Sequence, residues 1–153
     1  MTVEENLLFW NRFAGGNKQK TDLIELVRRL GLEGKWKSKV NLLSGGMKRK
    51  LNIAVALLHD PEILLMDEPT VGIDIQSKLE INRLMKALAQ QGKTIIYTTH
   101  DSNEILLLCD RIGVLKNGRF SFVGTMAEAL KVLKLNGKFP INEEEALYLL
   151  LNG

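Results

Sequence analysis

Hydrophobic residues recur at a helical period in the first third of the chain. A helix that opens with a capping box, Thr2 to Glu5, is predicted to run to about Phe13. A second helix is predicted over residues 21–30, with Thr21 as its cap and Gly31 as its stop.

From Ser44 onward the pattern changes. It predicts a helix that ends before Pro61, because proline disfavours helical backbone in the residue before it. The apolar run 63–66 is too short for a helix and predicts a strand buried on both faces. An amphipathic helix over 75–91 and a strand over 94–98 follow, and this strand–helix–strand order predicts a parallel crossover.

The last third is predicted to form shorter elements, and the whole pattern predicts an α/β fold with a parallel sheet. The remaining predicted elements are a helix over 103–108, a hairpin of strands 111–115 and 120–123 around Asn117-Gly118, a capping box at Thr125 and a helix over 142–151.

Composition narrows the class of protein only slightly. The 153 residues are 45% hydrophobic and 25% charged with a net charge of +3, which is ordinary for a soluble globular domain. The single cysteine, Cys109, cannot form an internal disulfide. Neither a span of apolar residues nor a secretion signal is visible, so we expect a cytoplasmic chain.

Two adjacent carboxylates, Asp67 and Glu68, follow the predicted buried strand. Both can reach one site only if the strand ends there, as Pro69 predicts, because side chains along a regular strand alternate between faces. A carboxylate at the C-terminal end of a parallel strand can hold magnesium, and its neighbour can accept a proton from an attacking water. A strand that simply runs into a turn explains the same residues.

Two further signals are weak when taken alone. Ser44-Gly45-Gly46 exposes the backbone N–H groups of a helix N-terminus, where a phosphate can approach, although an ordinary capped helix fits equally. His100 follows the strand 94–98, so it is predicted at the same sheet edge as Asp67, where an imidazole can contact a terminal phosphate. A lone histidine is more often structural.

Taken together, the order of these motifs resembles the nucleotide-binding domain of ABC transporters. Leu43–Met47 resembles the signature motif, Ile63–Asp67 the Walker B strand and Glu68 the catalytic base. Val71–Asp74 resembles the D-loop and His100 the switch histidine. The wording of the signature motif is most similar to that of drug and ABC-2-type exporters.

The resemblance implies an ATPase that uses ATP and Mg²⁺. In that interpretation Asp67 holds magnesium, Glu68 polarises the attacking water and His100 steadies the γ-phosphate. The implied nucleotide contacts are Ser44, Gly45, Gly46 and Asp74, of which the first three act across a dimer interface.

One motif of the family is not among these residues. The phosphate loop needs Gly-x-x-x-x-Gly-Lys followed by Ser or Thr, and the segment Gly113–Phe120 has only the glycine spacing and leads into a strand. We therefore expect an incomplete P-loop NTPase-like sheet without the Walker A strand, joined to part of the helical signature subdomain. The gap is expected between strands 94–98 and 111–115, with marginal stability and negligible ATP affinity for the isolated chain.

The favoured function is an ATP-hydrolysing subunit of an ABC-type membrane exporter, in a truncated or split form. Its expected partners are a second ABC ATPase subunit and a transmembrane permease subunit that holds it at the inner face of the membrane. The alternatives are a non-catalytic relic or regulatory partner of a complete subunit, and a soluble family member that acts on nucleic acid or ribosomes. No nucleic-acid partner is expected, because no aromatic residue interleaves the basic run Lys48–Lys50.

Three domains are predicted. They are the helical signature subdomain (1–60), the C-terminal part of the ATPase core (61–135) and a C-terminal helical extension (136–153).

Overall fold

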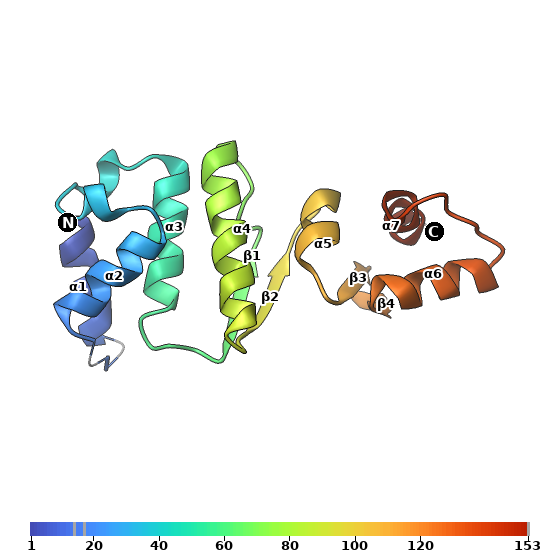
Figure 1. The fold of residues 1–153 in the computed structure, drawn as a ribbon, viewed down its shortest axis with the longest axis horizontal. Helices are drawn as coiled ribbons and strands as arrows, with labels where there is room; N and C mark the ends of the chain where they lie inside the picture. Colours follow the sequence, from blue (N-terminus) through green and yellow to red (C-terminus); the bar gives the residue numbers. More distant parts are fainter. Residues whose placement is uncertain (14, 17, 153) are drawn as a thin grey trace. The chain divides into compact units, whose positions relative to one another are not determined.

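The computed structural model describes residues 1–13, 15–16 and 18–152. They form two compact units, Met1–Thr98 and Thr99–Gly153. The predicted three-domain division stays a prediction. The elements of the first unit are α1 (Val3–Phe13), α2 (Lys20–Arg29), two 3-10 turns (Glu33–Lys35 and Val40–Leu42), α3 (Gly45–Ala56), β1 (Ile63–Asp67), α4 (Ile75–Gln90) and β2 (Thr94–Thr98) (Figure 1). Those of the second are α5 (Ser102–Leu108), β3 (Ile112–Lys116), β4 (Arg119–Gly124), α6 (Met126–Leu135) and α7 (Glu143–Asn152).

The first two helices follow their sequence signals with one correction. The backbone N–H of Thr2 donates to Glu5 Oε2 at 2.8 Å, so the predicted capping box is confirmed. The predicted Thr21 cap is wrong, because the N-cap is Gln19, two residues earlier, and α2 begins at Lys20. The carboxylate of Asp22, three residues on, accepts from the Gln19 N–H at 2.8 Å and favours this earlier start.

One acidic residue ties α1 to the segments after it. The Glu4 carboxylate contacts the ammonium of Lys20 at 2.6 Å and also that of Lys37. The hydrogen bond from Lys20, followed by that from Lys37, lowers the pKa of Glu4 from 4.5 to about 2. These contacts join the start of α1 to α2 and to the loop between the two 3-10 turns.

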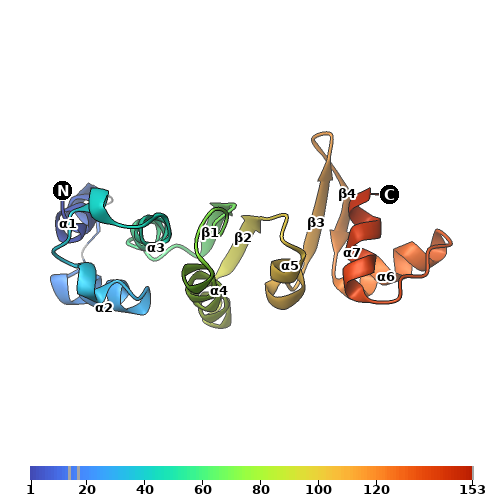
Figure 2. The same ribbon diagram turned by 90° about the horizontal axis from the view of Figure 1, so that it is seen from above.

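The strand–helix–strand prediction is confirmed. Strands β1 and β2 are parallel, with Ile63 opposite Thr94 and Asp67 opposite Thr98. Figure 2 shows α4 along one side of this strand pair. The core-facing side of α4 is formed by Ile81, Leu84, Met85 and Leu88, all of them buried.

The prediction that residues 63–66 form a strand buried on both faces is wrong. Leu64 is buried, but Leu65 on the other face is 71% exposed, and Ile63 and Ile96 beside it are 58% and 55% exposed. The physical reason is that α4 covers one face of the strand pair, and the apolar side chains of the opposite face lie in solvent. A continuous apolar run requires cover on both faces, and this unit provides it on one.

The second unit contains the predicted hairpin and capping box. Strands β3 and β4 are antiparallel and joined through Asn117 and Gly118, whose φ angles of 49° and 74° are the left-handed values that such a turn requires. At the start of α6 the backbone N–H of Thr125 donates to Glu128 Oε2 at 2.7 Å, and the N–H of Glu128 donates to Thr125 Oγ1 at 3.2 Å. Helix α7 packs against α5 and α6.

The fold class is the expected mixed α/β one, in which the parallel strand pair is part of a P-loop NTPase-like sheet. The described strands form two separate sheets, β1 with β2 and β3 with β4. The predicted gap between strands 94–98 and 111–115 stays a prediction, because the two sheets belong to different units. In the part of the chain that the structure describes, no helix has both the length and the hydropathy needed to cross a bilayer.

Candidate functional site

The two predicted catalytic acids lie where β1 ends. Asp67 is the last residue of the strand, and Glu68 leaves it with a φ of 43°, in the left-handed region. Pro69, which cannot donate a hydrogen bond to a ladder, is buried directly after it. The strand therefore ends at Asp67, shortly before Pro69, as predicted from the sequence. Asp67 is exposed and Glu68 is half-buried.

Thr98 joins these two acids, and the sequence reasoning missed it. Its hydroxyl donates to Asp67 Oδ1 at 2.5 Å and accepts from the backbone N–H of Glu68 at 3.0 Å. Only the register of the strand pair reveals it, because the parallel pairing of 63–67 with 94–98 places Thr98 opposite Asp67.

The predicted phosphate-binding tripeptide forms the start of α3. Ser44 is the N-cap, and its hydroxyl accepts from the Met47 N–H at 3.2 Å. Gly45 is exposed, and open space surrounds the position that a Cβ atom would occupy. Because Gly45 carries no side chain, a ligand could approach the backbone here closely.

Gly46 is instead buried against α4. A Cβ atom at this position would lie 2.3 Å from Ser77 Oγ, 2.6 Å from Ser77 Cβ and 2.9 Å from Asp74 Oδ2. These distances are far below ordinary contact, so the two helices approach this closely only because residue 46 is glycine. The second glycine thus has an intramolecular role that the sequence did not predict.

Asp74, the predicted D-loop acid, is the N-cap of α4. Its Oδ1 accepts from the Ser77 N–H at 2.8 Å. This backbone bond, followed by a hydrogen bond from the Ser77 side chain, lowers the pKa of Asp74, and the charge of Lys50 contributes in the same direction. The structure therefore brings Gly46 and Asp74 together, with the start of α4 against the start of α3.

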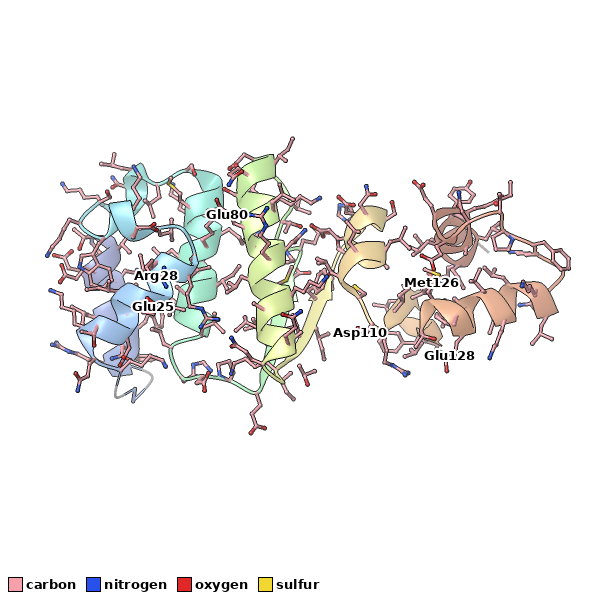
Figure 3. The ribbon with its side chains drawn as sticks, in the orientation of Figure 1. Glu25, Arg28, Glu80, Asp110, Met126 and Glu128 are labelled. Atoms are coloured by element: carbon pink, nitrogen blue, oxygen red, sulfur yellow. The ribbon has the colours of Figure 1, made fainter. Side chains whose placement is uncertain are left out.

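One turn further along, an ion pair links the same two helices. The ammonium of Lys50, a buried side chain, contacts the carboxylate of Glu80, which also accepts from Gln76 Nε2 at 2.7 Å. Figure 3 labels Glu80 on α4. The hydrogen bond from Lys50 is the main cause of a lowered pKa for Glu80. Helices α3 and α4 are thus held together by a glycine contact and a charge pair.

His100 belongs to the second unit and precedes α5. On either side of it, Thr99 Oγ1 donates to Glu104 Oε2 at 2.7 Å, and Asp101 caps the helix by accepting from the N–H of Asn103 at 2.9 Å. The backbone around His100 is therefore held by its neighbours within that unit. That His100 shares one site with Asp67 and Glu68 stays a prediction.

One exposed carboxylate, that of Asp67, is available to a cation at the end of β1, and the predicted role of Asp67 in holding Mg²⁺ stays a prediction. No group of three or more His, Cys, Asp or Glu side chains suited to a metal ion occurs among the residues that the structure describes. Mg²⁺ in ATPases is usually bound by one or two carboxylates, waters and the phosphates of the nucleotide. The exposed carboxylate of Asp67 would supply one such ligand.

This chain is similar to a protein-family model and to several known proteins. Residues 1–71 match the model of the ABC transporter family. The chain is 44% identical over 130 residues to the linearmycin resistance ATP-binding protein LnrL of Bacillus subtilis, covering 84% of this chain and 42% of that protein. It is 46% identical over 120 residues to the Nod factor export ATP-binding protein I of Rhizobium etli, covering 77% and 38%. The chain thus spans about two fifths of the length of these relatives.

Proposed function

We propose that this chain belongs to the ABC transporter family, whose model residues 1–71 match, and that it is part of the ATP-hydrolysing subunit of a membrane exporter. The similar proteins are named as ATP-binding proteins of export and resistance systems. The observation that carries the proposal is the end of β1, where Asp67 and Glu68 are adjacent at the end of a parallel strand. The hydroxyl of Thr98 is hydrogen-bonded to the carboxylate of Asp67 and to the backbone N–H of Glu68.

The proposed reaction is transfer of the γ-phosphoryl group of ATP to water, for which positioning and electrostatics supply most of the acceleration. Glu68 orients the attacking water and accepts its proton. His100 donates a hydrogen bond to the γ-phosphate. Asp67 would hold Mg²⁺, which when bound neutralises charge on the phosphate oxygens.

A nucleotide held by a second subunit would contact the N-terminus of α3, which carries the signature-like residues Leu43–Met47 of this chain. Ser44 and Gly45 are exposed at the N-terminus of α3, where backbone N–H groups and the helix dipole favour an anion. Gly46 and Asp74 contribute indirectly, because they fix the start of α3 against α4. The proposed partners are accordingly a second ATPase subunit and a transmembrane permease subunit, which would keep this chain at the inner face of the membrane.

The phosphate loop of the proposed site must come from polypeptide other than these 153 residues, as in a truncated or split subunit, because the motif is not among them. Without its lysine and backbone donors, the acids of β1 repel a triphosphate. We expect no ATP binding by the 153-residue chain at micromolar concentrations, measured by calorimetry with Mg²⁺ present. Micromolar affinity of this chain alone would contradict the split arrangement.

The activity itself is tested in a complex of this chain with the phosphate-loop part of a family subunit. Glu68→Gln should lower turnover by about 100-fold or more while sparing ATP binding, because the amide cannot accept the proton. Glu62→Gln is the matched control, since Glu62 is exposed and precedes the opposite end of the same strand. Near-normal turnover of the Glu68 variant would remove this residue from its role.

One observation favours a second candidate function, that of a non-catalytic interaction partner. Phe9, Trp10 and Phe13 of α1 contact one another through their rings yet are 52%, 38% and 75% exposed. Exposed aromatic clusters are typical of protein-binding surfaces. If this chain binds a complete ABC subunit through this surface, and the resulting complex hydrolyses no ATP at the site of this chain, the second function is favoured.

A further inference from the structure

The proposed reaction assigns no role to Thr98. It is the last residue of β2 and lies directly opposite Asp67 in the parallel register. Its hydroxyl makes both contacts described above, donating to a carboxylate oxygen and accepting from the backbone N–H of Glu68. A hydroxyl has one hydrogen, so these two bonds fix its orientation completely.

Each of these bonds constrains one of the two acids. The bond to Asp67 Oδ1, at 2.5 Å, has the length of a charge-assisted bond between a hydroxyl and a carboxylate. It fixes the rotation of that carboxylate about its own axis and leaves the second oxygen to a metal ion or its water.

The bond from the Glu68 N–H acts on the backbone. Glu68 has a φ of 43°, which costs a residue with a Cβ atom free energy, and such a conformation persists only where its surroundings enforce it. The chain has left the ladder here, so Thr98 Oγ1 provides the acceptor that a neighbouring strand no longer provides.

We propose that Thr98 is a positioning residue of the ATPase site, which sets the carboxylate of Asp67 and the backbone of Glu68 through a single hydroxyl. The inference rests on the proposed function for its chemistry, but its contacts can be tested without ATP. Thr98→Val removes the hydroxyl and keeps a β-branched side chain of nearly the same shape, whereas Thr98→Ser keeps the hydroxyl. Thr94→Val makes the same change at the other end of β2, also at an exposed position, and serves as the control.

The first experiment measures amide hydrogen exchange by NMR in the 153-residue chain. In Thr98→Val the Glu68 amide should exchange about tenfold faster, as expected for the loss of one hydrogen bond, while the β1–β2 ladder amides keep their rates. Thr98→Ser and Thr94→Val should leave the Glu68 amide unchanged. An unchanged Glu68 amide in Thr98→Val, with the ladder intact, would overturn the proposal.

The second experiment measures the Mg²⁺ dependence of ATP hydrolysis in the complex with the phosphate-loop part. Thr98→Val should raise the Mg²⁺ concentration for half-maximal turnover by about 10- to 100-fold, as for other groups that orient a metal ligand, and Thr98→Ser should restore it. A merely structural role would reduce the amount of folded protein and leave this Mg²⁺ concentration unmoved, which would also overturn the proposal. If the wild-type complex hydrolyses no ATP, the proposed function fails, and the exchange experiment alone decides whether Thr98 holds the strand end.

Discussion

Substituting alanine for each glycine of the Ser44-Gly45-Gly46 tripeptide in turn separates a ligand-binding role from a packing role. Both positions lie in the first turn of α3, so the gain in helix propensity, at most about 1 kcal/mol, is similar at the two sites. Only the surroundings differ. A Cβ atom added to Gly45 would meet nothing within 4 Å, whereas the same atom added to Gly46 would lie 2.6 Å from Ser77 Cβ.

The cost of the second substitution follows from that distance. Ordinary van der Waals contact begins at 3.4 Å, so α3 and α4 would have to separate by about 0.8 Å at this point. Rotating Ser77 moves its hydroxyl away but leaves its Cβ in place, since Cβ is fixed to the helix backbone. Overpacking of this kind costs about 1–3 kcal/mol, so we expect Gly46→Ala to be less stable than Gly45→Ala by about 2 kcal/mol.

Urea unfolding followed by tryptophan fluorescence measures this difference. Both tryptophans, Trp10 and Trp36, lie in the Met1–Thr98 unit, so the signal reports the unit in which α3 packs on α4. Adding Ser77→Gly to Gly46→Ala removes both Ser77 atoms that clash. The double variant should recover about 1–2 kcal/mol beyond the sum of the single effects.

Two outcomes would refute the reasoning. Equal unfolding midpoints for the two alanine variants would mean that the helices are not in close contact at Gly46. A Gly46 variant that Ser77→Gly fails to rescue would mean that its loss of stability has another cause. Neither measurement involves nucleotide, so the result does not depend on the proposed activity.

Two further predictions concern charges in the same unit. Lys50→Met should lower the free energy of unfolding of this unit in urea by about 1–3 kcal/mol, because the mostly buried Glu80 carboxylate loses its cation. Breaking the exposed Glu25–Arg28 pair should cost less than about 1 kcal/mol. Equal costs would contradict the structural role of the buried pair. The Glu4 carboxyl has a folded-state pKa of about 2, below its ordinary 4.5, so its contribution to stability is complete above pH 4.5 and is lost as the pH falls toward 2. Glu4→Gln should flatten the pH dependence of the unfolding midpoint across that window, and an unchanged slope would argue against the lysine contacts.

Elements with strong local signals were predicted closely from the sequence. The strand over 94–98 has the predicted bounds, and the helix over 75–91 is one residue shorter, because an Asp cap and a left-handed Gly92 define its two ends. The cap of α2 lies two residues earlier than predicted, since Asp22 reaches back to Gln19 and competes with the Thr21 cap. Capping competition between neighbouring residues is decided by side-chain geometry, which a sequence pattern does not contain.

The candidate site was also predicted only in part, because some of its residues are defined by tertiary contacts. Asp67 and Glu68 stand out because acids at the end of an apolar run are unusual, and the family resemblance gave them roles. Thr98 and the packing role of Gly46 depend on what lies across a register or a helix contact. A threonine in a strand and a glycine at a helix start are ordinary residues until their partners are known. Local patterns identify the reactive groups, and only the tertiary contacts identify the residues that hold them.

The exposed face of the strand pair links the stability of this unit to its chemistry. Side chains alternate along a strand, so Ile63 and Leu65 share a face with Asp67, and Ile96 shares it with Thr98. Covering these three apolar side chains, each of which is more than half exposed, would contribute about 3 kcal/mol. The same cover would exclude water beside Asp67 and Thr98, where electrostatic stabilisation of a phosphoryl group needs a low dielectric. We therefore expect that a polypeptide packed on this face would raise both the stability of the unit and the activity of the proposed site.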